Sequence, residues 1–253
     1  MIFSRKNNRT CSNNTECPNI NNVNLERVKS IKFLGVIIND CLNWDDHKKY
    51  VKSKISRNLG ILYKCRHIMN KKDLISMYNS FIAPYLLYCI PIWGGSITSK
   101  SDDIIKIQNK VIRILFNVSR TEDAWQYVKD SILTVTDLYK VEVAKFCYKH
   151  VNNILPKSFI DNVMPTFAKD AHNIVTRHSD SLNYQVIDNN MKPLSYKSFT
   201  SQCVRIWNSL PYLMKVQTDI QNTSPNFSKQ LKDYYLWTAN NRGKWQPFTN
   251  INH

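Results

Sequence analysis

The sequence predicts a mainly α-helical protein with a small β-hairpin near its N-terminus. Only 5 of the 253 residues are glycine, which leaves few positions for tight turns and favours helices over sheets. Beyond residue 44, apolar residues recur mostly at helical spacing. The stretch 28–38 instead alternates polar and apolar residues and continues as a β-branched run. We expect it to form a strand, or a two-stranded hairpin that bends at Gly35.

Several later segments carry the apolar stripe of an amphipathic helix. In the clearest one, over about 45–67, apolar residues recur at steps of four, four and three. Two aspartates begin this segment and Arg66 ends it, as the helix macrodipole favours. The stripe consists of Val51, Ile55, Leu59 and Leu62. Further helices are expected over 72–82, 101–117 with Ser101 as its cap, 136–152, 196–208 and 226–238, a loop over 4–24, and an irregular segment over about 165–195.

Positive charge is concentrated in the first half of the chain. The formal net charge is +16, and residues 1–120 hold twenty basic against eight acidic residues, a net charge of +12. Such an uneven excess is typical of proteins that bind polyanions. A generally basic surface that aids solubility is the alternative.

Four cations on the expected 45–67 helix are the candidate phosphate contacts. On an ideal helix Arg57 and Lys64 fall opposite the apolar stripe, and Lys49 and Lys54 flank them. Residues 45–72 carry nine basic residues and only the two aspartates of the first turn. This composition favours contact with a nucleic-acid backbone over a face that is merely solvated.

The cysteines and the apolar segments indicate neither a metal site nor a membrane protein. The seven cysteines include no C-x-x-C motif, and the pairs Cys11–Cys17 and His172–His178 lack a second ligand pair at zinc-finger spacing. We therefore expect no metal site and mostly buried, free thiols. The longest apolar run, 81–93, is too short for a membrane span and contains two prolines. We expect a soluble, intracellular protein of the cytoplasm or nucleus.

The chain also carries a series of short motifs in a particular order. They run from Phe33-Leu34-Gly35-Val36 and Asn43-Trp44 through Pro84-Tyr85-Leu86-Leu87-Tyr88-Cys89, Ile92-Trp93-Gly94, Gln108-Asn109-Lys110, Asp137-Leu138-Tyr139 and Leu155-Pro156 to Thr176-Arg177-His178 and Trp207-Asn208-Ser209-Leu210-Pro211. Each motif alone is weak, but their order and spacing make the combination specific. The series resembles the C-terminal part of the reverse transcriptases of jockey-like non-LTR retrotransposons.

The resemblance implies a division of the chain and a role for two of its parts. Residues 1–43 would be the end of the polymerase palm, 44–120 a thumb-like helical domain and 121–253 a helical C-terminal extension. The hairpin would be a primer-grip-like element, and the 45–67 helix a thumb helix that lies along the template–primer backbone. The primer-grip-like residues are Phe33, Leu34, Gly35 and Val36; simple core packing is the other interpretation of Phe33, Leu34 and Val36.

The catalytic aspartates of that family are expected upstream of this chain. Polymerases hold two metal ions with carboxylates, but Asp45-Asp46 and Asp102-Asp103 both lie at expected helix starts. By the resemblance, Met1-Ile2-Phe3 falls after the catalytic hairpin of the palm. We therefore expect no catalytic residue and no cofactor here, although the parent enzyme would use Mg²⁺.

The resulting prediction is a fragment of an RNA-directed DNA polymerase that is inactive alone. Its expected partners are the backbone of an RNA or DNA template–primer and the palm portion of the polymerase. Two other interpretations stay open: a domesticated basic, helical nucleic-acid-binding module, and a helical protein–protein scaffold whose charge is incidental.

Overall fold

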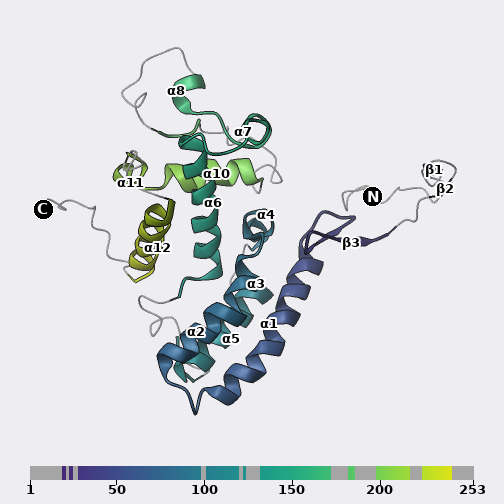
Figure 1. Cartoon of the computed structure of the whole chain (residues 1–253), viewed down its shortest axis with the longest axis vertical. Helices are drawn as coiled ribbons and strands as arrows, with labels where there is room; N and C mark the ends of the chain where they lie inside the picture. Colours follow the sequence, from purple (N-terminus) through teal and green to yellow (C-terminus); the bar gives the residue numbers. More distant parts are fainter. Residues whose placement is uncertain are drawn as a thin grey trace, which may run out of the picture.

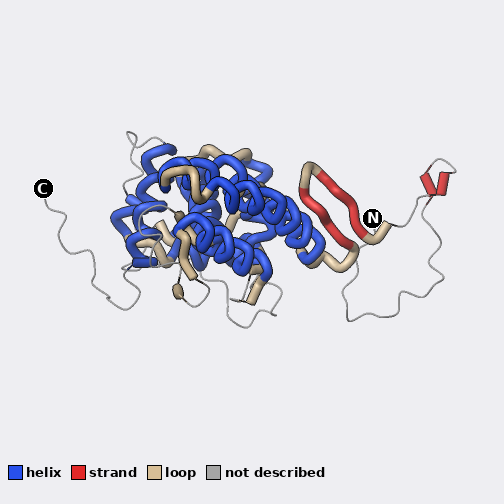
Figure 2. Tube along the Cα trace, turned by 90° about the horizontal axis from the view of Figure 1, so that it is seen from below, coloured by secondary structure: helices blue, strands red, loops and turns tan. Residues whose placement is uncertain are grey.

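The fold is mainly α-helical, as predicted, with two short antiparallel hairpins at its N-terminal end (Figure 1). A computed structural model describes residues 19–20, 23–24, 28–97, 101–119, 122–123, 132–171, 182–185, 198–216 and 224–240. Seen from below, the helices form one body and the strands lie at one end of it (Figure 2).

The larger hairpin consists of β3 (Ser30–Phe33) and β4 (Val36–Asn39), which pair antiparallel. Leu34 and Gly35 form its two-residue turn with φ values of 44° and 81°. Tight hairpin turns use such positive φ values because their twist matches that of the strands. The predicted bend at Gly35 is therefore confirmed.

A second, very short hairpin lies in a region where the sequence predicted only a loop. β1 (Asn19–Ile20) pairs with β2 (Val23–Asn24), and Ile20 lies opposite Val23. The prediction of a continuous loop over 4–24 is therefore wrong at these four residues.

The helix α1 (Asp45–Cys65) packs its apolar stripe against α5 (Asp103–Phe116) and α2 (Lys71–Phe81). The predicted stripe is buried throughout, and the helix ends two residues before the predicted end. The predicted Ser101 cap of α5 is wrong. Asp102 is the residue with extended backbone before the helix, and its carboxylate accepts the Ile104 N–H at 3.0 Å.

The apolar run 81–93 folds into the core as two short helices. Pro84 and Pro91 are the second residues of α3 (Ala83–Leu87) and α4 (Ile90–Trp93), within the first turn, where a missing N–H breaks no helical hydrogen bond. A 3₁₀ turn, η1 (Gly94–Ser96), follows. Within the described residues, no helix combines the length and the apolar character that a membrane crossing requires.

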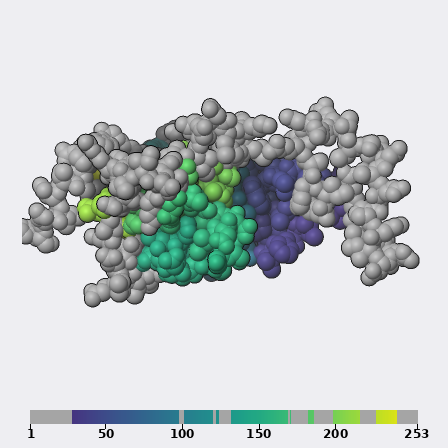
Figure 3. Space-filling view, turned by 90° about the horizontal axis from the view of Figure 1, so that it is seen from above, coloured from purple at the N-terminus to yellow at the C-terminus, as the bar shows by residue number. Residues whose placement is uncertain are grey.

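The later helices gather around α6 (Val135–Val151). α10 (Phe199–Asn208) and α12 (Ser224–Asn240) pack on it, and three short helices complete this part: α7 (Lys157–Val163), α8 (Ala168–Ala171) and α11 (Tyr212–Val216). The sequence did not predict the short ones, and α8 lies in the region 165–195 that was expected to be irregular. In the space-filling view these later residues lie directly beside the N-terminal ones (Figure 3).

One hydrophobic core runs through both helical parts of the described chain. Gln108 of α5 is buried and holds the start of α6: its Oε1 accepts the Val135 N–H at 2.8 Å and its Nε2 donates to the Leu133 carbonyl at 3.0 Å. Gly94 lies so close to α6 that a Cβ there would be 2.5 Å from Tyr139 Cδ2. The boundary expected near residue 120 therefore separates helices that share a core.

The Trp207-Asn208 motif has a structural explanation within the chain. Asn208 pairs with the backbone of Tyr184 in both directions, accepting its N–H at 3.0 Å and donating to its carbonyl at 2.9 Å. The fully buried Trp207 donates from Nε1 to the Leu182 carbonyl at 2.7 Å. Together the two side chains hold the segment 182–185 against α10.

Candidate nucleic-acid interface

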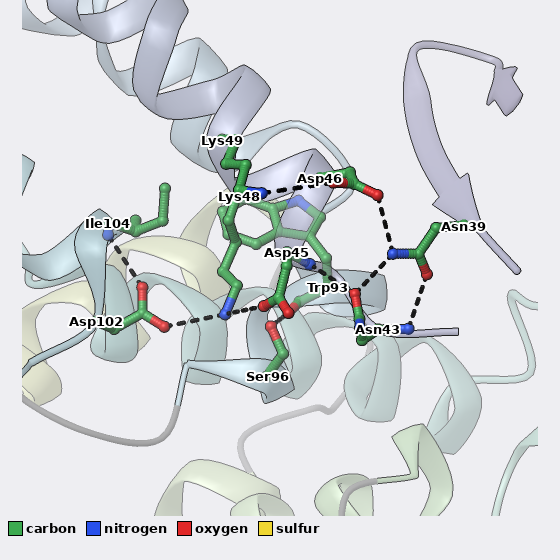
Figure 4. A network of polar contacts seen from close by, with 10 residues as sticks. All are labelled: Asn39, Asn43, Asp45, Asp46, Lys48, Lys49, Trp93, Ser96, Asp102 and Ile104. Atoms are coloured by element: carbon green, nitrogen blue, oxygen red, sulfur yellow. Dashed lines mark hydrogen bonds and ion pairs between the residues drawn. The ribbon is translucent and has the colours of Figure 1, made fainter. Parts of the chain in front are cut away.

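The larger hairpin is fixed to the N-terminal end of α1 by a polar network (Figure 4). The buried Asn39 donates from Nδ2 to Asn43 Oδ1 at 2.7 Å and to Asp46 Oδ2 at 3.0 Å, and its Oδ1 accepts the Asn43 N–H at 3.0 Å. Because Asn39 ends β4 and Asp46 lies in the first turn of α1, the hairpin cannot swing away from the helix without losing these bonds.

Two further hydrogen bonds hold the hairpin. The Ile37 N–H donates to Nδ1 of the buried His47 at 3.3 Å, and the Tyr88 hydroxyl donates to the Leu34 carbonyl at 2.6 Å. Burial lowers the pKa of His47, which keeps the ring neutral and leaves Nδ1 able to accept. The position of the hairpin tip is thus set by α1 and by the residue that follows α3.

Both aspartate pairs singled out in the sequence serve helix ends and ion pairs. Lys48 Nζ lies 3.4 Å from Asp45 and 3.2 Å from Asp102, and Lys52 Nζ lies 2.8 Å from Asp103. The hydrogen bond and charge of Lys52 lower the pKa of Asp103. Two of these pairs, Lys48–Asp102 and Lys52–Asp103, join α1 to the start of α5.

The aspartates therefore do not fit the two-metal site of a polymerase. Within the part of the chain that the structure describes, no three His, Cys, Asp or Glu side chains are grouped to hold a metal ion. The Cys11–Cys17 and His172–His178 pairs lie outside the described residues.

All four predicted phosphate contacts lie on α1, but their surroundings differ. Arg57 and Lys64 are exposed and have no ion-pair partner among the described residues. The Lys49 side chain is 78% exposed, with Asp46 at 3.9 Å. Lys54 is half-buried and places Nζ 5.4 Å from the centre of the Tyr50 ring. The structure thus leaves Arg57 and Lys64 as the cations most open to an external anion.

The primer-grip-like residues divide between surface and core. Phe33 is 60% exposed and Leu34 75% exposed, whereas Val36 is buried. The core interpretation is therefore wrong for Phe33 and Leu34 and right for Val36. The reason is the orientation of the hairpin: β4 packs on α1, and all of β3 lies exposed on the outside. Gly35 allows the close approach of Tyr88, whose Cε1 would be 3.1 Å from a Cβ at this position.

Sequence reasoning missed an aromatic groove beside the hairpin. It has a volume of about 460 Å³ and lies between the hairpin tip, α1 and the α2–α3 corner. Tyr50, Phe81, Tyr85 and Tyr88 supply its aromatic walls. Tyr50 comes from α1 and the other three from a separate segment, so only the tertiary fold brings them together.

Comparisons with known proteins give no relative of this chain. No family model, no curated protein and no solved structure matches it.

Proposed function

We propose that this chain binds the sugar–phosphate backbone of a nucleic acid along the outer face of α1, as the thumb of a non-LTR retrotransposon RNA-directed DNA polymerase would. The observation that carries the proposal is the unequal pairing of charge around this helix. Lysines facing α5 have carboxylate partners, whereas Arg57 and Lys64 on the opposite side have none among the described residues. No acidic residue follows Asp46 in the helix.

Part of this exposed face carries only small residues. Ser53, Ser56 and Gly60 are all exposed on the outer face of α1. A glycine inside a helix costs about 0.5–1 kcal/mol relative to alanine, and a Cβ at Gly60 would meet nothing within 4 Å. Packing within the described chain therefore does not require this glycine. A nucleic-acid backbone that approaches the helix closely supplies a reason for it.

The hairpin extends this proposed interface at the N-terminal end of α1. Phe33 and Leu34 project from its tip with large exposed fractions, although the hairpin itself is firmly anchored. An exposed apolar tip on a fixed support suits contact with the end of a primer strand. In this proposal the chain positions nucleic acid, and the palm of the polymerase supplies the metal-binding carboxylates.

The test is a salt titration of binding to a labelled RNA–DNA primer–template duplex, followed by fluorescence anisotropy. Each neutralised phosphate contributes about −0.9 to the log–log slope on B-DNA. The R57Q/K64Q variant should therefore show a slope that is shallower by about one to two units, with little dependence on sequence.

The matched control is K229Q/K232Q, which removes the same charge from exposed positions on α12. Its slope should stay close to that of the wild-type chain. If both variants weaken binding equally, the interaction follows net charge, and if neither changes the slope, the face is solvated surface. Either result contradicts the proposal, and the second favours a protein–protein scaffold.

A further inference from the structure

We propose that the aromatic groove beside the hairpin holds an unpaired nucleobase at the end of the strand that α1 binds. This inference rests on the proposed function and adds a second, chemically different contact to it. The outer face of α1 would contact phosphates, whereas the groove would contact the flat face of a base.

The walls of the groove suit a flat aromatic ligand. Phe81 and Tyr88 are 48% and 51% exposed, and Tyr50 and Tyr85 are partly buried. The volume of about 460 Å³ falls within the range of small-ligand sites, roughly 300–1,000 Å³. Bases of single strands stack on such side chains without regard to sequence, because every base has a π-face.

The groove is also held open by bonds within the chain. The Tyr88 hydroxyl donates to the Leu34 carbonyl at 2.6 Å and so joins one wall to the hairpin tip. Asn58 donates from Nδ2 to the Phe81 carbonyl at 2.6 Å and joins α1 to the end of α2. Because these contacts fix the walls in advance, a ligand would not have to order them.

The charges at the groove favour a nucleotide over an apolar peptide. The Tyr50 ring has two cations near it, Lys32 Nζ at 5.3 Å and Lys54 Nζ at 5.4 Å from its centre. No acidic side chain lines the groove. Lys54 also lies one helical turn from Arg57, so a strand can pass from the outer face of α1 to the groove along a row of positive charge. Cations interleaved with aromatic rings are the usual surface for single strands.

The experiment compares three duplexes that differ only at one end: blunt, with one unpaired 2-aminopurine nucleotide, and with one unpaired abasic nucleotide. For the wild-type chain we expect the unpaired base to increase affinity by about 5- to 150-fold over the blunt duplex, the usual range for one stacked base. The 2-aminopurine fluorescence should be quenched on binding, and the abasic end should give little gain.

Tyr50→Leu should remove this gain and the quenching while leaving affinity for the blunt duplex nearly unchanged. Tyr63→Leu is the matched control: Tyr63 lies on the same helix with Arg66 4.1 Å from its ring centre, but outside the groove. Phe81→Leu replaces a half-exposed wall and should act like Tyr50→Leu, so the test does not depend on the folding of one variant.

Several outcomes would overturn the inference. Equal affinities for all three ends, with salt-dependent binding intact, would remove the base site and leave the proposed function standing. Equal gains from the base and the abasic nucleotide would assign the effect to the phosphate. Loss of the gain in the Tyr63 variant would show that the groove is not responsible. Absence of salt-dependent binding to any duplex would remove the proposed function as well.

Discussion

Gln108 joins the two helical parts of the molecule, and its replacement by leucine should destabilise the whole fold. The side chain is 1% exposed and bonds to Val135 N–H, Leu133 C=O and, at 3.3 Å, the Tyr78 hydroxyl. Val135 is the first residue of α6, so its N–H has no acceptor within the helix. Gln108 therefore acts as a cap supplied by another helix.

The magnitude follows from the groups that would be left without partners. One buried backbone donor and one buried backbone acceptor lose their bonds, at about 1–3 kcal/mol each. The leucine side chain needs no hydrogen-bond partner, and its burial offsets part of this loss. We expect the free energy of unfolding to fall by about 2–4 kcal/mol.

Urea unfolding followed by circular dichroism at 222 nm measures this change. Lys110→Leu, at an exposed position on the same helix, is the control and should stay within about 0.5 kcal/mol of the wild-type chain. A Gln108→Leu variant that matched the control would refute the reasoning, because it would mean that this bond pattern does not hold α6 in place.

Two further predictions concern packing and pH. Gly94→Ala places a Cβ against the buried Tyr139 ring and should lower the free energy of unfolding by about 1–3 kcal/mol in urea titrations, whereas Gly60→Ala, in open space, should raise it slightly. Burial lowers the pKa of His47, so the unfolded chain binds more protons, and stability should fall as pH drops below about 6.5. His47→Asn keeps an acceptor for the Ile37 N–H and should weaken that pH dependence; an unchanged slope would contradict it.

The elements with a strong local pattern were predicted well from the sequence. The stripe of α1 repeats over three turns without a proline, so its span was predicted to within two residues at its C-terminal end. The predicted cap of α5 was wrong because serine and aspartate, the residue types of Ser101 and Asp102, are both favoured at the N-cap position. Only the backbone conformation at Asp102 decides between them.

The surface around the hairpin could not be predicted in the same way. Both strands carry apolar residues, so alternation alone does not say that β4 faces α1 while Phe33 stays exposed. The groove depends on the break between α2 and α3, which brings Tyr85 and Tyr88 towards Tyr50 of α1. These are consequences of tertiary packing, which no local pattern in the sequence contains.

Net charge gave the least specific prediction, and the fold explains why. The value of +12 for residues 1–120 counts Lys52 and Arg57 equally, but Asp103 neutralises Lys52 from another helix. The side chains of this ion pair are about half exposed, so it contributes only about 0–1 kcal/mol to stability. Its larger consequence is electrostatic. By cancelling charge on the side of α1 that faces α5, the pair leaves the positive potential of the helix on the side of Arg57 and Lys64, where a polyanion can approach.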